Sequence, residues 1–175
     1  MNQLASTIKS VAVDFDPFAD AFPALVKSIP STPAQQEMWA SILMDAKASC
    51  AFNESFTLSF QGELNIAALN AAFQALVARH DALRACFSQD GLNLNIYETL
   101  DTPVTVEQLA GRAKEEIIAE ETQYQFDLVN GPLFKVRLLK AADDCHYFIF
   151  TAHHIICDGW SLGIVIADLS ALYNA

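Results

Sequence analysis

The chain has 175 residues, 53% of them hydrophobic and 18% charged, so it can bury a core, and its length favours a single domain. Its formal net charge of −11 argues against a nucleic-acid partner, which would need a basic face to displace phosphate counterions. The longest apolar runs, 147–152 and 162–167, are too short to span a bilayer, and no export signal is recognisable. We therefore expect a cytoplasmic protein with no membrane partner.

The chain divides into two parts of different character. Residues 1–29 carry Pro17 and Pro23 among several aspartates and show no sustained periodicity, which predicts a linker or an N-terminal arm. Regular hydrophobic patterns begin near residue 30. The folded body is therefore predicted to span 30–175.

A capping box predicts the first helix of this body. Thr32 can act as the N-cap, Pro33 suits the first helical position, and Gln35 stands three residues after the cap. The apolar stripe of this helix is then predicted to contain Trp39, Ile42, Leu43 and Ala46.

A strand, a helix and a hairpin are predicted next. Residues 55–61 alternate apolar and polar side chains, as in a half-buried strand. Asn65 can cap the following helix. Segments 85–88 and 92–97 flank an Asp-Gly pair and indicate a hairpin. The apolar stripe of the helix is Ile66, Leu69, Phe73, Leu76 and Val77.

Helices and strands are also predicted to alternate in the second half of the chain. Residues 106–121 are predicted as an amphipathic helix whose charges form its solvated face, and 133–139 as a strand. Residues 147–152 are apolar at nearly every position, so this strand should be central and covered on both faces. Ser161 is predicted to cap a last helix, and the whole pattern indicates an alternating α/β domain. The stripe of the last helix is Leu162, Val165, Ile166, Leu169, Leu172 and Tyr173.

The four cysteines are predicted to be reduced, partly buried thiols, because they form no C-x-x-C pair. The alternative is a zinc site built from Cys145, His146, His153, His154 and Cys157. The strand between them places Cys145 about 26 Å from His153, so at most the last three could converge. We therefore predict no metal site.

The turn after the apolar strand concentrates groups suited to acid-base chemistry. If the strand continues through His153 and His154, their side chains point to opposite faces, so only one of them can address a given cavity. Asp158 and Gly159 make the turn, where glycine permits positive φ and a close approach by a ligand. The alternative is purely structural: Asp158 and Ser161 cap the helix and the histidines are satisfied core groups.

Four segments, in the expected order, resemble motifs of the condensation domains of nonribosomal peptide synthetases, members of the chloramphenicol-acetyltransferase-like superfamily. Residues 153–159, HHIICDG, are similar to the H-H-x-x-x-D-G signature. The other matches are 32–39 (TPAQQEMW), 79–87 (RHDALRACF, with Ala85 where threonine is usual) and 126–133 (FDLVNGPL). In addition, 48–55 (ASCAFNES) resembles condensation domains placed after polyketide modules.

This resemblance implies a fold and a reaction. The fold would be an α+β sandwich, the chloramphenicol-acetyltransferase-like N-terminal subdomain, with a mixed central sheet and helices packed on it. The reaction joins a donor acyl thioester to the amine of an acceptor aminoacyl thioester. Both substrates are carried on the phosphopantetheine arms of upstream and downstream carrier proteins, and no cofactor is bound directly.

The resemblance also implies residue roles. His154 matches the catalytic histidine, acting either as general base or in positioning the tetrahedral intermediate, and His153 supports it. Asp158 would be a buried carboxylate that holds the turn, with the Arg84 guanidinium as candidate partner; a solvent-exposed Arg84 is the alternative. Gly159 would keep the substrate tunnel open and offer its N–H to the oxyanion.

Complete condensation domains resemble two such halves arranged in a V around the signature motif. The sequence stops soon after the signature helix, so we expect the N-terminal half, whose partner is the C-terminal half and which is inactive alone. Two other interpretations stay open: an acyl-CoA-dependent acyltransferase of the same superfamily, and a non-catalytic docking or scaffold module.

Overall fold

The computed structural model describes residues 23–100 and 102–175, so most of the predicted arm lies outside the described residues. Its centre is a four-stranded mixed sheet in the order β2-β7-β6-β5, in which β5 runs parallel to β6 and the other neighbours are antiparallel. The apolar strand β7 is central, as predicted. The strands are β2 (Asn53–Gln61), β5 (Val106–Gln108), β6 (Phe134–Ala142) and β7 (Cys145–His153).

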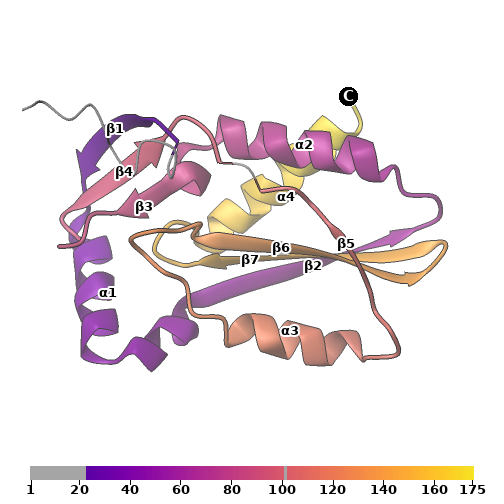
Figure 1. Ribbon diagram of the computed structural model, residues 1–175, viewed down its shortest axis with the longest axis horizontal. Helices are drawn as coiled ribbons and strands as arrows, with labels where there is room; N and C mark the ends of the chain where they lie inside the picture. Colours follow the sequence, from indigo (N-terminus) through magenta and orange to yellow (C-terminus); the bar gives the residue numbers. More distant parts are fainter. Residues whose placement is uncertain (1–22, 101) are drawn as a thin grey trace, which may run out of the picture.

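Helices cover both faces of this sheet (Figure 1). On one face lie α2 (Ile66–Arg79) and α4 (Gly159–Tyr173), and on the other lies α3 (Lys114–Thr122). The Phe73 ring of α2 packs edge-on against Phe134 and Phe148 of the sheet. A smaller apolar group under α3 is formed by Ile117, Leu139 and Ile149. The strand β7 is thus covered on both sides, which confirms the predicted α/β class.

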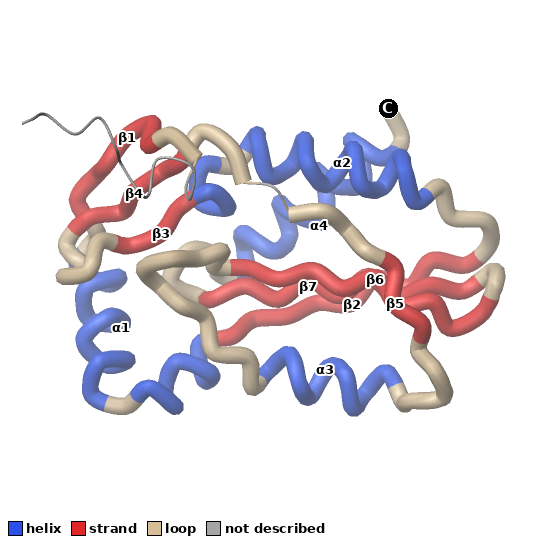
Figure 2. Tube along the Cα trace, viewed as in Figure 1, coloured by secondary structure: helices blue, strands red, loops and turns tan. Residues whose placement is uncertain are grey.

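A smaller sheet stands beside the larger one (Figure 2). Its strand order is β1-β4-β3, and α1 packs next to it. The turn of the predicted Asp-Gly hairpin requires glycine, because Gly91 has φ +71° and a Cβ there would lie 2.5 Å from the Trp39 ring. The elements are β1 (Leu25–Pro30), α1 (Pro33–Met44), β3 (Ala85–Phe87) and β4 (Asn93–Tyr97), with two short 3₁₀ helices at Ala46–Phe52 and Asp81–Arg84.

Two of the three predicted N-caps, Thr32 and Asn65, are confirmed. The Thr32 hydroxyl accepts a bond from the Gln35 N–H while the Gln35 side chain accepts one from the Thr32 N–H, a complete capping box. The Asn65 side chain accepts a bond from the Ala68 N–H at the start of α2. In α1, however, Leu43 is 73% exposed, so the predicted apolar stripe is too wide there.

Three predicted elements need correction. Residues 106–121 are not one helix: β5 pairs with β6, a turn with Ala110 and Gly111 at positive φ follows, and α3 starts only at Lys114. The last helix starts at Gly159 and is capped by Asp158 instead of Ser161. Secondary structure also begins before residue 30, because β1 pairs with β4. This strand is exposed along its length and carries no local apolar alternation.

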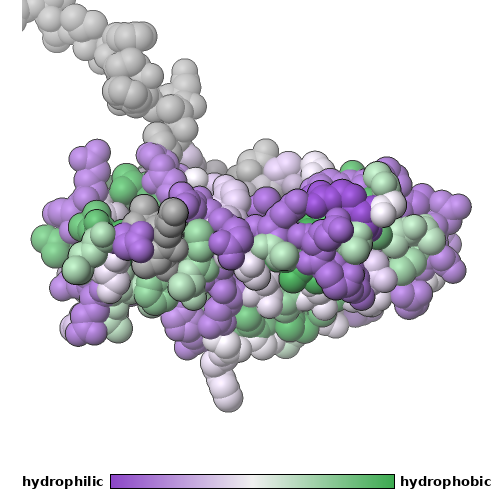
Figure 3. All heavy atoms as spheres, turned by 90° about the horizontal axis from the view of Figure 1, so that it is seen from below, coloured by the Kyte–Doolittle hydropathy of each residue, from purple (hydrophilic) through white to green (hydrophobic). Residues whose placement is uncertain are grey.

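The face seen in Figure 3 mixes hydrophilic and hydrophobic side chains. Among the residues that the structure describes, no helix is long and apolar enough to cross a membrane.

Candidate active site

The histidine pair lies at the end of the central strand, where backbone bonds fix its position from both sides. Asn53 of β2 lies opposite His153, the last residue of β7. The His153 N–H donates to the Leu133 carbonyl over 2.9 Å, and the His154 N–H donates to the Phe52 carbonyl over 2.7 Å. These bonds hold the backbone of both histidines and so fix the direction in which each ring points.

His153 points toward the face of the sheet that α3 covers, and its ring is fully buried. Its Nδ1 accepts a hydrogen bond from the Ile155 N–H over 3.1 Å. Because Nδ1 is an acceptor, the ring proton sits on Nε2, which lies 3.3 Å from the Ser49 hydroxyl. Burial, and then the neighbouring His154, lower the pKa of His153 to about 4. His153 is a neutral packing residue of the turn.

His154 points to the opposite face, as strand alternation predicts, and 37% of its side chain is exposed. Its Nδ1 is buried and lies 2.8 Å from Oε1 of Glu54, but out of line for a directed hydrogen bond. The exposed part of the ring therefore consists of atoms other than Nδ1. Of the two histidines, His154 is the one whose ring a ligand could reach.

Sequence reasoning missed Glu54, which lies 100 residues before His154. Glu54 has the same strand parity as Phe56, Leu58 and Phe60, which pack against the main core. A carboxylate in an otherwise apolar series was the signal available in the sequence.

Asp158 and Gly159 start α4, but not in the way the sequence predicted. Asp158 is exposed, and its carboxylate accepts bonds from the Ser161 N–H over 2.8 Å and the Ser161 hydroxyl over 2.5 Å. These bonds hold the pKa of Asp158 below its usual value. Gly159 is helical and has no positive φ; a Cβ there would lie 4.0 Å from the Glu54 carboxylate. The expectation of a buried Asp158 is therefore wrong, whereas its structural role as a cap is visible.

The predicted pair of Arg84 with Asp158 is also wrong. The Arg84 guanidinium bonds Asp81 over 2.7 Å and donates to the carbonyls of Val77 and Tyr97. Its side chain is only 10% exposed, so the alternative of an exposed arginine is wrong too. Because 3₁₀ residue Asp81 lies three positions away, Arg84 finds its carboxylate locally and ties this segment to the end of β4.

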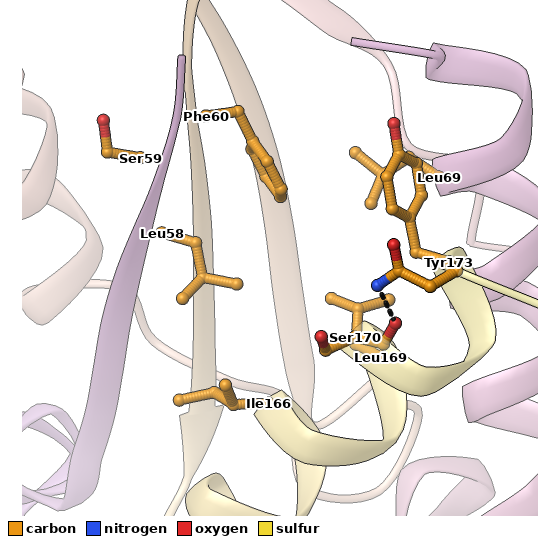
Figure 4. Close-up of a pocket in the computed structure, with 9 residues that line it drawn as sticks. Leu58, Ser59, Phe60, Leu69, Ile166, Leu169, Ser170 and Tyr173 are labelled. Carbon is orange, nitrogen blue, oxygen red and sulfur yellow. Dashed lines mark hydrogen bonds between the residues drawn. The ribbon is translucent and has the colours of Figure 1, made fainter. Parts of the chain in front are cut away.

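Two of the hollows along α4 have volumes of about 300 Å³ or more. One, of about 390 Å³, opens between β2 and the C-terminal part of α4, where Leu58, Phe60 and Ile166 point into it (Figure 4). The other, of about 300 Å³, lies on the outer surface of the helix, next to the histidine turn. It is lined by Gly159, Trp160, Gly163, Ile164 and Ala167. Because Trp160 is 82% exposed there, this face of α4 is apolar and uncovered.

The four cysteines are free, as predicted: Cys86 and Cys157 are buried, and Cys50 and Cys145 are half-buried. Burial raises the pKa of the Cys157 thiol to about 12, with smaller contributions from Glu54 and Asp158. Cys157 is therefore a neutral neighbour of the turn and not a thiolate. In the described part of the chain, no group of three or more His, Cys, Asp or Glu residues is placed to hold a metal ion.

Comparison with known proteins gives consistent results. The profile of the family described as "Condensation domain" matches residues 26–175. The chain is 34% identical over 154 residues to malpinin synthetase of Mortierella alpina, a match over 84% of this chain and 2% of the synthetase. It is also 33% identical over 175 residues to surfactin synthase subunit 1 of Bacillus subtilis (strain 168), a match over 98% of the chain and 5% of that protein. The chain thus spans a small part of these relatives.

Solved structures agree in fold. The starter condensation domain of the rhizomide synthetase RzmA superposes with a TM-score of 0.74 at 26% identity, covering 85% of this chain and 38% of that one. The condensation domain of the monacolin K polyketide synthase MokA gives a TM-score of 0.77 at 22% identity, covering 87% of this chain and 35% of that one. The fold expected from the sequence motifs is therefore confirmed.

Proposed function

Because the chain belongs to the condensation-domain family, we propose that it is the N-terminal half of such a domain in a nonribosomal peptide synthetase and that His154 is its working imidazole. The observation that carries the proposal is the position of His154. Its ring is accessible at the end of the central strand, while the neighbouring His153 is buried and neutral.

The reaction proposed for the complete domain is amide formation. The amine nitrogen of the acceptor aminoacyl group attacks the thioester carbonyl of the donor, the new C–N bond forms, and the C–S bond breaks. His154 takes the proton that the amine loses and passes it to the departing phosphopantetheine thiolate, so that a thiol and an amide result. A base of this kind contributes about 10²–10⁴ in rate. If His154 positions the tetrahedral intermediate instead, it would act through the same exposed side of its ring.

The neighbouring residues support this imidazole. His153 anchors the turn through Ile155 and Ser49. Asp158 caps α4, and Gly159 leaves the space beside the Glu54 carboxylate free of a side chain. Arg84, held by Asp81 and backbone carbonyls, stiffens the second motif at a distance from the reacting groups.

The proposed partners are the upstream and downstream carrier proteins, whose phosphopantetheine arms deliver the two substrates, and the C-terminal half of the domain. The uncovered apolar face of α4 is where we propose that this second half packs. Two facts support this choice: the face lies next to His154, and the matched starter condensation domain is much longer than the part that this chain covers. The acyl-CoA-dependent and docking alternatives have no such support.

The test is an amide-formation assay with donor and acceptor groups loaded on carrier proteins. The complete domain should form product, and the 175-residue chain alone should form none, because one wall of the substrate tunnel is missing. Product formed by the chain alone would contradict the two-half arrangement. Acyl-CoA accepted as readily as the carrier-bound donor would instead favour the acyl-CoA-dependent transferase.

A further inference from the structure

We infer that Glu54 is a positioning residue for His154: its carboxylate holds the ring proton on Nδ1 and leaves Nε2 free to accept a proton. The inference rests on the proposed function, in which His154 is the working imidazole. It assigns a role to a residue outside the sequence motifs.

The strand pairing places Glu54 beside His154. Glu54 lies opposite Ala152 in the β2–β7 ladder, and the next backbone bond joins the His154 N–H to the Phe52 carbonyl over 2.7 Å. The pairing between β2 and β7 and the bond that follows it therefore fix the backbone of both residues. Their side chains meet on the same face, with 2.8 Å between Glu54 Oε1 and His154 Nδ1.

The contact has features that a surface ion pair lacks. Nδ1 of His154 is buried and finds no aligned hydrogen-bond acceptor among the residues that the structure describes, so Glu54 is the acceptor within reach. The side chains are 37% and 31% exposed, which leaves the pair partly shielded from water. The other carboxylate of the turn, Asp158, is engaged by Ser161.

This geometry has a chemical consequence. The tautomer of a neutral histidine depends on the groups beside its two nitrogens, so a carboxylate oxygen 2.8 Å from Nδ1 favours the form with the proton on Nδ1. The unprotonated Nε2 can then take the proton of the attacking amine. The imidazolium that results is stabilised by the carboxylate behind it, the same division of labour as in other nucleophile and base pairs with a third, orienting group. The misaligned contact in the free protein is expected to tighten when substrates bind.

The alternative is an ordinary exposed ion pair, which contributes little to either stability or chemistry. The two histidines of this turn allow a direct distinction. His153 is fixed as the Nε2–H tautomer by its bond from Ile155, whereas the inference requires the Nδ1–H tautomer for His154.

The first experiment measures both tautomers by long-range ¹H–¹⁵N NMR on the 175-residue chain, at alkaline pH where imidazoles are neutral. His154 should be Nδ1–H in the wild-type chain and in Glu54→Gln, which keeps an acceptor oxygen. It should shift toward Nε2–H in Glu54→Ala. His153 should stay Nε2–H throughout and reports that the turn is intact. Glu63→Gln, which removes an exposed charge after the same strand, is the matched control. A wild-type His154 that is Nε2–H would overturn the inference.

The second experiment measures turnover in the complete domain as a double-mutant cycle. Glu54→Ala should lower kcat at least about tenfold, Glu54→Gln less, and Glu63→Gln not at all. On a His154→Ala background, Glu54→Ala should have no further effect. If His154→Ala is inactive but Glu54→Ala turns over normally, only the role of Glu54 fails. If His154→Ala itself turns over normally, the proposed function fails, whatever the tautomers are.

Discussion

His153 accepts a hydrogen bond on Nδ1 from the backbone N–H of Ile155, two residues further along the chain, over 3.1 Å. This bond can be made only by a neutral imidazole, because a protonated ring has no acceptor. Together with complete burial, it explains why the first histidine of the signature is a structural residue. It also makes the turn sensitive to acid.

Stability should therefore fall between neutral pH and about pH 4 because of His153. Its pKa in the folded chain is about 4, below the ordinary value of 6.5, so in this window the unfolded chain binds a proton that the folded chain does not. The free energy of unfolding then falls by up to about 3 kcal/mol as the pH falls from about 6.5 to about 4. Above this window His153 makes no pH-dependent contribution to it. Urea unfolding of wild type and His153→Asn at pH 7.5, 6 and 4.5 measures this. Equal pH dependence in both proteins would contradict it.

Asp158→Ala should destabilise the chain, whereas Asp158→Asn should not. The Asp158 side chain caps α4 by accepting the Ser161 N–H, and asparagine caps helices about as well as aspartate does. We expect Tm to fall by about 2–4 °C for the alanine variant only. A similar drop for the asparagine variant would mean that the charge of Asp158, and not its capping bond, stabilises the fold.

Glu121→Ala should cost far more stability than Glu120→Ala on the same helix. The Glu121 side chain is only 2% exposed and binds Lys135 over 2.9 Å and Arg137 over 3.2 Å. Its loss removes a buried carboxylate that both cations share, although Arg137 keeps its pair with Glu107. We expect a loss of about 1–3 kcal/mol. Glu120 is 54% exposed, and its removal should have little effect. Chemical denaturation measures the free energy of unfolding of both variants. Equal losses in the two variants would refute the structural role of Glu121.

Trp160→Ala should leave the stability of the 175-residue chain unchanged within about 0.5 kcal/mol, because the side chain is 82% exposed. In the complete domain, the same change should destabilise the fold by roughly 1–3 kcal/mol if the apolar face of α4 packs against the second half. Leu43→Ala, at another exposed apolar site, serves as control. The packing proposal is refuted if Trp160→Ala is neutral in both proteins.

The parts of the fold that could be predicted from the sequence are those fixed by local chemistry. The Thr32 and Asn65 caps and the Asp-Gly turn depend on bonds within a few residues, and β7 is apolar enough to identify a central strand. The prediction of a single helix at 106–121 was wrong because β5 is held by pairing with β6, about 30 residues away. No local pattern reveals such a pairing. The strand β1 was missed for the same reason.

In the candidate site, too, the features set by local geometry could be predicted, and those set by distant segments could not. Alternation along β7 correctly separated His153 from His154, because it depends only on strand geometry. The partners of both rings come from distant segments: Ser49 for His153 and Glu54 for His154. The predicted partner Arg84 was wrong because Asp81, three residues away, competes for the guanidinium at much lower conformational cost.

The central claim is that His154 is the working imidazole, and the most direct test is amide formation by the complete domain carrying His154→Ala. Donor and acceptor are loaded on carrier proteins, and single-turnover product formation is followed. His154→Ala should lower the rate at least about a hundredfold while the domain stays folded. Near-normal turnover would contradict this role.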